Sequence, residues 1–149
     1  MSDQQKSKMN LEKLTRMREC KPLAPFPISD LALCERYEKL YTGAINDVLR
    51  EFCLVDQALP PEIHPLRDEM KICGIAYTIR SSKDPLISGE MDTRAKMLDE
   101  MPRNCICVWD TGGETEAAHW GEIMTAASVV RGARGAVIDG GLRDTKQVL

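Results

Sequence analysis

Apolar residues in the first half of the chain recur at the spacing of a helix. They fall at Leu33, Tyr37, Leu40, Ala44, Val48 and Phe52. Ser29 or Asp30 is placed to cap this stretch, and the Thr-Gly pair at 42–43 indicates a break between two helices. Residues 1–19 are polar and charged and predict a loose amphipathic helix or a mobile arm. Residues 20–30 carry three prolines within six positions, so they predict an extended linker.

From residue 72 onward the pattern alternates between strands and helices. The predicted elements are a strand over 72–80, a helix over 91–101, a strand over 104–110, a helix over 121–132 and a strand over 135–139. Apolar residues share one face of the second helix: Ile123, Ala126, Ala127 and Val130. Gly132 fits the end of that helix. Strands that alternate with helices of this length predict βαβ units, and therefore an α/β fold with a parallel sheet.

Composition narrows the range of partners. A chain of 149 residues has room for one domain with a core, and its net charge of −3 gives no sign of a nucleic acid partner. No apolar run has the length of a membrane helix. The six cysteines include no CxxC pair and there are only two histidines, which argues against zinc. We therefore expect reduced thiols and a cytoplasmic protein.

The predicted topology places three loops at one edge of the sheet. Parallel strands end at the same edge, and the helix between them starts there. The loops are 110–113, the helix start at Gly121–Glu122, and 139–144. Open α/β sheets bind ligands at this edge.

The residues of this edge favour a small anion together with a hard metal ion. The first N–H groups of helix 121–132 have no intrahelical acceptors, which suits them to a carboxylate. Arg143 adds a planar donor fork, Asp144 an oxygen ligand for Mg²⁺, and Glu122 a second acid. A 2-oxo acid matches this set, because cleavage beyond its methylene leaves a pyruvate enolate whose charge falls on the keto oxygen. A metal ion and an arginine both stabilise that charge.

Two segments resemble a known family. "GIAYTI" and "WGEIMTAASVVRGARGAVIDGGLRD" are similar to the RraA-like family, with an acidic residue after glycine at a helix start, then G-x-x-G-x-V-x-D-G and R-D. The resemblance runs from about Leu40 to the C-terminus. It implies the swivelling β/β/α fold, with N-terminal helices before βαβαβ units. Residues 1–28 are the expected arm and Pro-rich linker. The resemblance also implies an RraA-like domain over 29–149 that lacks the family's C-terminal third, so we expect a fragment, a truncated gene product or an incomplete chain.

The enzymatic branch of that family, 4-hydroxy-4-methyl-2-oxoglutarate (HMG/CHA) aldolase, implies a metal-dependent lyase. Such an enzyme cleaves 4-hydroxy-2-oxo acids to pyruvate and decarboxylates oxaloacetate, with Mg²⁺, Mn²⁺ or another divalent ion. By resemblance the substrate site comprises the amides of Gly121, Glu122, Ile123 and Met124 together with Arg143. Asp144 would bind the metal, and Arg143 and Glu122 would be catalytic, Glu122 relaying a proton or orienting a water. Family members form homotrimers or hexamers with active sites at subunit interfaces.

Each candidate also has a plainer interpretation. Arg143–Asp144 alone is typical of a surface pair that caps a helix starting near Thr145, and Glu122 of a first-turn carboxylate favoured by the helix dipole. His119 could touch the substrate, and Asp92 and Arg94 could form part of the entrance, but a capping or surface role and a solvated helix face are favoured for them. For the other residues structural roles are favoured: loop for His64, turn for 139–141, packing for Trp109 and Trp120, and core for Cys105 and Cys107.

Two other functions compete with the lyase. The first is a non-catalytic regulator of ribonuclease E, the other branch of the family, which acts by protein contacts and is expected to lack the complete acid and R-D set. The second is a methyltransferase acting on demethylmenaquinone, an old label for such sequences. We discount it because no glycine-rich adenosylmethionine loop follows the first strand.

Overall fold

The computed structural model describes residues 11–19, 25–82 and 88–149. The arm at 1–10, and Cys20 with the first part of the linker at 20–24, lie outside these described residues. Contacts divide the chain into two units, one of residues 1–27 and 39–60 and one of residues 28–38 and 61–149. None of the helices within the described ranges is long and apolar enough to span a membrane.

The first unit contains helices α1 (Leu11–Arg18) and α3 (Thr42–Glu51), and helix α2 (Asp30–Glu38) belongs to the second. The helical stretch therefore breaks before Thr42, as the Thr-Gly pair predicted. The hydroxyl oxygen of Ser29 accepts a hydrogen bond from the backbone N–H of Ala32 at 3.3 Å, which is the expected N-terminal cap of α2.

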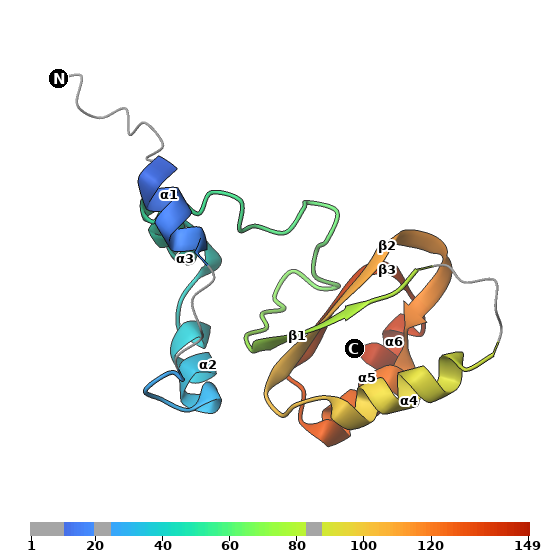
Figure 1. The fold of residues 1–149 in the computed structure, drawn as a ribbon. Helices are drawn as coiled ribbons and strands as arrows, with labels where there is room; N and C mark the ends of the chain where they lie inside the picture. Colours follow the sequence, from blue (N-terminus) through green and yellow to red (C-terminus); the bar gives the residue numbers. More distant parts are fainter. Residues whose placement is uncertain (1–10, 20–24, 83–87) are drawn as a thin grey trace, which may run out of the picture. The chain divides into compact units, whose positions relative to one another are not determined.

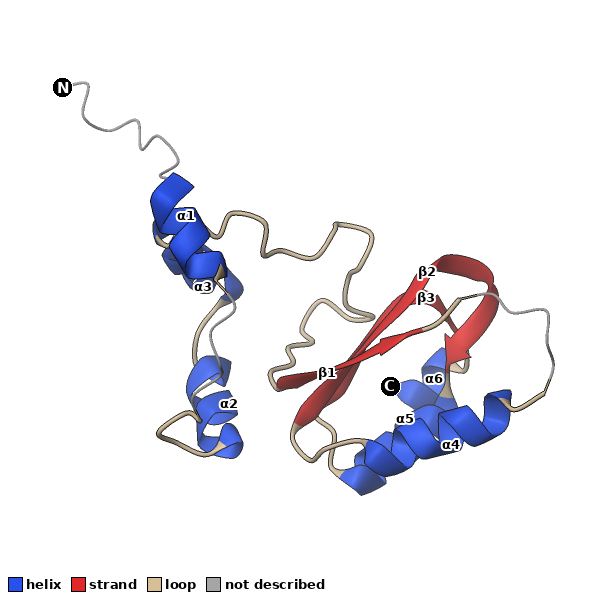
Figure 2. Ribbon diagram, viewed as in Figure 1, coloured by secondary structure: helices blue, strands red, loops and turns tan. Residues whose placement is uncertain are grey.

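The second unit contains a parallel three-stranded sheet in the order β1 (Ile75–Arg80), β2 (Cys105–Trp120), β3 (Gly135–Leu142). Helix α4 (Glu90–Glu100) connects β1 to β2, α5 (Glu122–Arg131) connects β2 to β3, and α6 (Thr145–Val148) follows β3. Because the strand order is sequential and such crossovers share one hand, α4 and α5 lie on the same face of the sheet (Figures 1 and 2). The α/β class predicted from the alternating pattern is confirmed.

The core lies between the sheet and these two helices. Its buried members are Met101, Cys105, Cys107, Trp109, Trp120 and Met124. Cys105, Cys107 and Trp109 alternate along β2 on the face that meets the helices, as a strand's period of two requires. Their predicted roles in core and packing are confirmed.

Strands β2 and β3 run further than the pattern predicted, so the expected loops at 110–113 and 139–141 are wrong. The ladder continues from Asp110 to Trp120 through several register shifts, and Gly112 and Gly113 have positive φ, as in a bulge. Opposite this bulge, a Cβ on Gly140 would lie 2.5 Å from the hydroxyl oxygen of Thr111. Gly140 therefore permits close strand approach rather than a turn.

Helix α5 buries a different side from the one its apolar residues indicated. Met124 and Ser128 are its buried residues, whereas Ile123, Val129 and Val130 are exposed. Ile123, Ala126, Ala127 and Val130 line a shallow groove shared with Ala95 and Leu98 of α4. The predicted apolar face is thus largely a surface of the described chain.

Candidate functional site

The start of α5 is held by a short chain of hydrogen bonds. The indole N–H of Trp120 donates to the hydroxyl of Thr125 at 2.8 Å, and that hydroxyl donates to the carbonyl of Gly121 at 3.0 Å. Gly121 is the residue before the helix and has an extended backbone, with φ of −169°. These two hydrogen bonds therefore hold the turn that orients the first N–H groups of α5.

Arg143 and Asp144 come to this same turn from the end of β3. The backbone N–H of Arg143 donates to the carbonyl of Trp120 at 3.0 Å. One carboxylate oxygen of Asp144 lies 3.4 Å from the backbone nitrogen of Glu122 and 3.4 Å from Nε of Arg143. The structure therefore brings together the R-D pair and the helix start, two features that lie about twenty positions apart in the sequence.

Asp144 has a backbone conformation that fits a positioned residue better than a simple cap. Its φ of 57° is left-handed, which non-glycine residues adopt infrequently. Helix α6 does start at Thr145, as the plainer interpretation expected, yet the Asp144 side chain makes no capping bond to it. Its carboxylate instead points toward α5 and is 40% exposed.

Gly121 lies close to the side chains of both Arg143 and Asp144. A Cβ there would lie 2.7 Å from the Asp144 carboxylate and 2.9 Å from Cγ of Arg143. Its backbone is one that any residue can adopt, so it is the close approach of the two side chains that requires glycine.

A hollow of about 50 Å³ opens beside this turn. Its lining residues are Arg94, Ala118, His119, Trp120, Gly121, Ile123, Met124 and Arg143. Of the predicted substrate-binding residues it includes Gly121, Ile123, Met124 and Arg143. Glu122 is different, since only its backbone reaches Asp144 while the residue lines the groove between α4 and α5. A catalytic role for the Glu122 carboxylate stays a prediction.

Two lining residues were assigned structural roles in the sequence analysis. Arg94 was placed on a solvated helix face, yet its side chain is only 25% exposed and its Nη1 donates to the carbonyl of His119 at 3.1 Å. His119 has a buried Nδ1 with no hydrogen-bond partner among the described residues, and its ring stands edge-on to Trp109 at 5.8 Å. No spacing rule pointed to Arg94, because the contact joins residues 25 positions apart.

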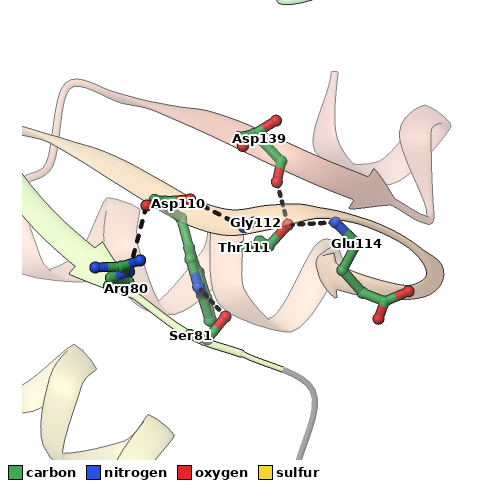
Figure 3. A network of polar contacts seen from close by, with 8 residues as sticks. Arg80, Ser81, Asp110, Thr111, Gly112, Glu114 and Asp139 are labelled. Atoms are coloured by element: carbon green, nitrogen blue, oxygen red, sulfur yellow. Dashed lines mark hydrogen bonds and ion pairs between the residues drawn. The ribbon is translucent and has the colours of Figure 1, made fainter.

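The predicted loop at 110–113 forms a separate polar network (Figure 3). The hydroxyl of Thr111 donates to the carbonyl of Asp139 and accepts from the backbone N–H of Glu114 at 3.1 Å. The Asp110 carboxylate accepts from the N–H of Gly112 at 2.9 Å and lies 3.6 Å from Nε of Arg80. Since these groups bond to one another and none lines the hollow, the network holds the β2 bulge in place rather than forming part of the site.

The thiols near the core are poor nucleophiles. Burial raises the pKa of the Cys107 thiol to about 12, with a smaller contribution from Cys105. Burial also raises the pKa of Cys105. Both thiols are free, as are Cys34, Cys53 and Cys73. Covalent catalysis by Cys105 or Cys107 is therefore disfavoured.

The metal chemistry available at this edge rests on Asp144. Within the described residues no three histidine, cysteine or acidic side chains gather to hold an ion. A single accessible carboxylate fits Mg²⁺, which keeps several waters and is commonly held by one or two carboxylates plus groups of the substrate. It fits zinc poorly, because zinc prefers nitrogen and sulfur ligands.

One protein family matches most of the chain. A model described as RraA-like, Aldolase/RraA, matches residues 42–149. The chain belongs to the RraA-like family. The resemblance noted in its sequence is thus confirmed at the level of the family, which includes both lyases and regulators.

Several relatives and solved structures are similar to this RraA-like chain. The curated protein DlpA of Legionella pneumophila is 29% identical over 107 residues, 72% of this chain and 17% of DlpA. A crystal structure described as one of novel cellulases from microbes associated with the gut ecosystem is 50% identical, with a TM-score of 0.81 over 94% of this chain and 63% of that chain. RraAS2 of Streptomyces coelicolor, described as an unusual member of the RNase ES inhibitor RraA protein family, is 21% identical, with a TM-score of 0.67 over 83% of this chain and 60% of that one. The chain therefore spans about a sixth of DlpA and less than two thirds of these solved chains.

Proposed function

We propose that this chain carries the active site of a divalent-metal-dependent carbon–carbon lyase. Its substrates would be 4-hydroxy-2-oxo acids of the 4-hydroxy-4-methyl-2-oxoglutarate type, which it would cleave to pyruvate, and oxaloacetate, which it would decarboxylate. The observation that carries the proposal is the convergence of Arg143, Asp144 and the start of α5 beside one hollow.

Substrate binding would use the helix start and Arg143. The first N–H groups of α5 lack intrahelical acceptors and lie at the positive end of the helix dipole, so they suit the substrate carboxylate. The Asp144 carboxylate already lies near one of them, at a long 3.4 Å. That separation is weak for a hydrogen bond, so an incoming carboxylate can compete for this N–H group.

The chemical step places negative charge where Arg143 can neutralise it. In aldol cleavage the C4 hydroxyl loses its proton and the C3–C4 bond breaks, so its electron pair moves to C3 and onto the keto oxygen. In decarboxylation the same electron pair is released as carbon dioxide leaves. A guanidinium beside that oxygen stabilises the transition state, and losing one such donor typically costs about 3–4 kcal/mol.

Asp144 would hold the divalent ion. When bound there, the ion would supply positive charge to the same keto oxygen and orient the 2-oxo acid. Glu122 is the proposed proton relay, through a side chain that lies at the adjoining groove.

We place this activity in the cytoplasm and in a homotrimer or hexamer. The five described cysteines are all free, which fits a reducing compartment. The exposed apolar residues of α5 fit burial against another subunit.

The second candidate is a regulator that acts through protein contacts, and two observations favour it. RraAS2 belongs to a family of ribonuclease inhibitors. Ile123, Val129 and Val130 of α5 are also exposed, and exposed apolar side chains are available for contact with a protein partner. The lyase remains the better proposal, because a regulator needs neither the R-D pair nor the left-handed backbone at Asp144.

Cellulose hydrolysis, named for one solved relative, fits the hollow poorly. Glycosidases use two carboxylic acids across the scissile bond. The described residues that line this hollow include two arginines and no carboxylate.

The test is pyruvate release from oxaloacetate by the purified chain with Mg²⁺, with a chelator, and without protein. We expect release above the protein-free rate only with Mg²⁺, and its loss in Arg143→Ala. The matched control is Arg80→Ala, which removes an exposed arginine at the end of β1, outside the hollow. Equal rates with and without protein would overturn the lyase and leave the regulator.

A further inference from the structure

Arg94 is held toward the hollow by contacts on three sides. Its Nε and Nη2 lie 2.8 and 2.6 Å from one carboxylate oxygen of Glu90, one turn earlier on α4. Its Nη1 donates to the carbonyl of His119 at 3.1 Å, and its Cζ lies 5.2 Å from the ring centre of Trp109. These contacts fix the plane of the guanidinium before any ligand arrives.

The fixed guanidinium keeps donors for a ligand. Each terminal nitrogen carries two N–H groups, and the contacts of the described residues account for one on each. One N–H on Nη1 and one on Nη2 are therefore not used by these contacts. Lys96, two positions along the same helix, has an exposed side chain paired with Glu100 and does not line the hollow.

Two cationic side chains line the same small hollow. Arg94 and Arg143 are both in its lining, whereas their carboxylate partners Glu90 and Asp144 are not, as far as the described residues show. Two guanidiniums at one hollow can each bind one carboxylate, so the lining suits a ligand with two carboxylates better than a ligand with one.

We propose that Arg94 is a specificity-determining residue that selects dicarboxylic over monocarboxylic 2-oxo acids by binding the second carboxylate. This inference rests on the proposed 2-oxo acid site and adds to it the residue that recognises the far end of the substrate. Arg143 would act on the end that all 2-oxo acids share, and Arg94 on the end that only dicarboxylic ones carry. Bidentate N–H donors suit a planar carboxylate.

The test compares two unreactive ligands that share the 2-oxo acid end. The dissociation constants of 2-oxoglutarate, with two carboxylates, and of pyruvate, with one, are measured by calorimetry with Mg²⁺ for the wild-type chain and Arg94→Gln. We expect the dissociation constant of 2-oxoglutarate to rise roughly 10- to 100-fold, the usual effect of a hydrogen bond to a charged group. That of pyruvate should change less than about two-fold, since pyruvate carries no second carboxylate for Arg94 to bind.

Two further variants and one kinetic comparison keep the test decisive. Arg94→Lys retains the charge and loses the planar fork, so it should recover part of the preference, and it replaces Arg94→Gln if the latter does not fold. Lys96→Gln makes the same charge change on the same helix and should bind both ligands like the wild type. In steady-state assays of oxaloacetate, Arg94→Gln should raise KM while kcat stays within a few-fold, unlike Arg143→Ala, which should lower kcat.

The outcomes separate this inference from the proposed function. Equal weakening of both ligands, or no change in either, would overturn the role of Arg94 even if oxaloacetate is still decarboxylated. A wild-type chain that prefers 2-oxoglutarate through Arg94 but releases no pyruvate would support the dicarboxylate site and overturn the lyase. A wild-type chain that binds neither ligand would overturn both.

Discussion

Arg134 and Arg143 lie at the two ends of the same strand, one residue before β3 and one residue after it. The side chain of Arg134 is 21% exposed, and its Nε donates to the carbonyl of Cys73 at 2.5 Å while its Nη2 pairs with the Glu38 carboxylate. The side chain of Arg143 is 66% exposed and has one carboxylate, Asp144, at 3.4 Å.

The contacts of these two arginines imply different tasks. Arg134 joins β3 to α2 and to the segment before β1, and its hydrogen bond to the Glu38 carboxylate raises the pKa of Arg134 above the ordinary value. The side chain of Arg143 connects few parts of the fold, but it lines the hollow beside the start of α5. Arg134 does not line the hollow and serves the fold, whereas an arginine that lines the hollow can offer its remaining donors to a ligand.

The largest expected effect separates these two tasks directly. Arg143→Ala should lower the rate of pyruvate release from oxaloacetate by roughly 10²–10³-fold, because a donor to the developing oxyanion is lost. Its thermal unfolding midpoint should stay close to that of the wild type, since the side chain is mostly exposed. Steady-state kinetics and a melting curve on the same sample check both; a rate within three-fold of wild type would rule out a catalytic Arg143.

Asp144→Asn should have the second largest effect. We expect the Mg²⁺ concentration for half-maximal rate to rise at least about ten-fold, because the amide keeps the shape but loses the charge that a hard cation needs. The measurement is a Mg²⁺ titration of the decarboxylation rate, with Asp110→Asn in the β2 bulge as the matched control. An unchanged Mg²⁺ requirement would mean that the ion is held elsewhere.

Gly121→Ala tests whether the close approach at α5 matters. A Cβ placed 2.7 Å from the Asp144 carboxylate and 2.9 Å from Cγ of Arg143 must displace both side chains. We expect about a ten-fold loss of kcat/KM, the size that a displacement of order 1 Å produces or exceeds. The backbone there is extended, so folding should be retained. A variant with wild-type kcat/KM would show that the two side chains need not be close to Gly121.

Arg134→Gln is the converse experiment. It removes the ion pair with Glu38 and weakens the bond to Cys73, so the thermal midpoint should fall by a few degrees. The rate per folded molecule should stay at the wild-type value, because Arg134 is at the opposite end of β3 from the hollow. A fall in activity at temperatures where the variant is fully folded would contradict the division between the two arginines.

The smallest expected effect is a loss of stability at alkaline pH, and it involves neither arginine. Burial raises the pKa of Cys107 from 9.0 to about 12, so the unfolded chain loses this proton first. The contribution of the protonated Cys107 thiol to the free energy of unfolding is complete below pH 9. It is lost as the pH rises toward 12, at about 1 kcal/mol per pH unit. Unfolding curves at pH 8 to 10.5 should show the decline in wild type, Arg134→Gln and Arg143→Ala alike, and a shallower decline in Cys107→Ala.

The sequence predicted those features that depend on local spacing. Helix α5 between Gly121 and Gly132, the break before Thr42 and the buried alternation of Cys105 and Cys107 all follow from periodicity and capping. The meeting of the R-D pair with the start of α5 followed from the rule that parallel strands end at one edge.

What the sequence missed depends on contacts between distant elements. For Arg94 the sequence favoured a solvated helix face over a place at the entrance, and only the packing of α4 puts it against Trp109 and the carbonyl of His119. The exposure of Ile123 and Val130 depends on which side of α5 faces the core, and spacing along one helix does not encode that. The length of β2 depends on a bulge that only its pairing with β3 reveals.

Oxalate offers the most direct measurement of the central claim, because it is a planar, unreactive dianion shaped like the enolate of pyruvate. Calorimetric titration of oxalate into the wild-type chain, Arg134→Gln and Arg143→Ala, each with Mg²⁺ and with a chelator, needs no turnover. We expect binding that requires Mg²⁺, that is unchanged in Arg134→Gln and that is lost in Arg143→Ala. Binding that survives in Arg143→Ala, or that needs no Mg²⁺, would contradict a 2-oxo acid site built from Arg143 and Asp144.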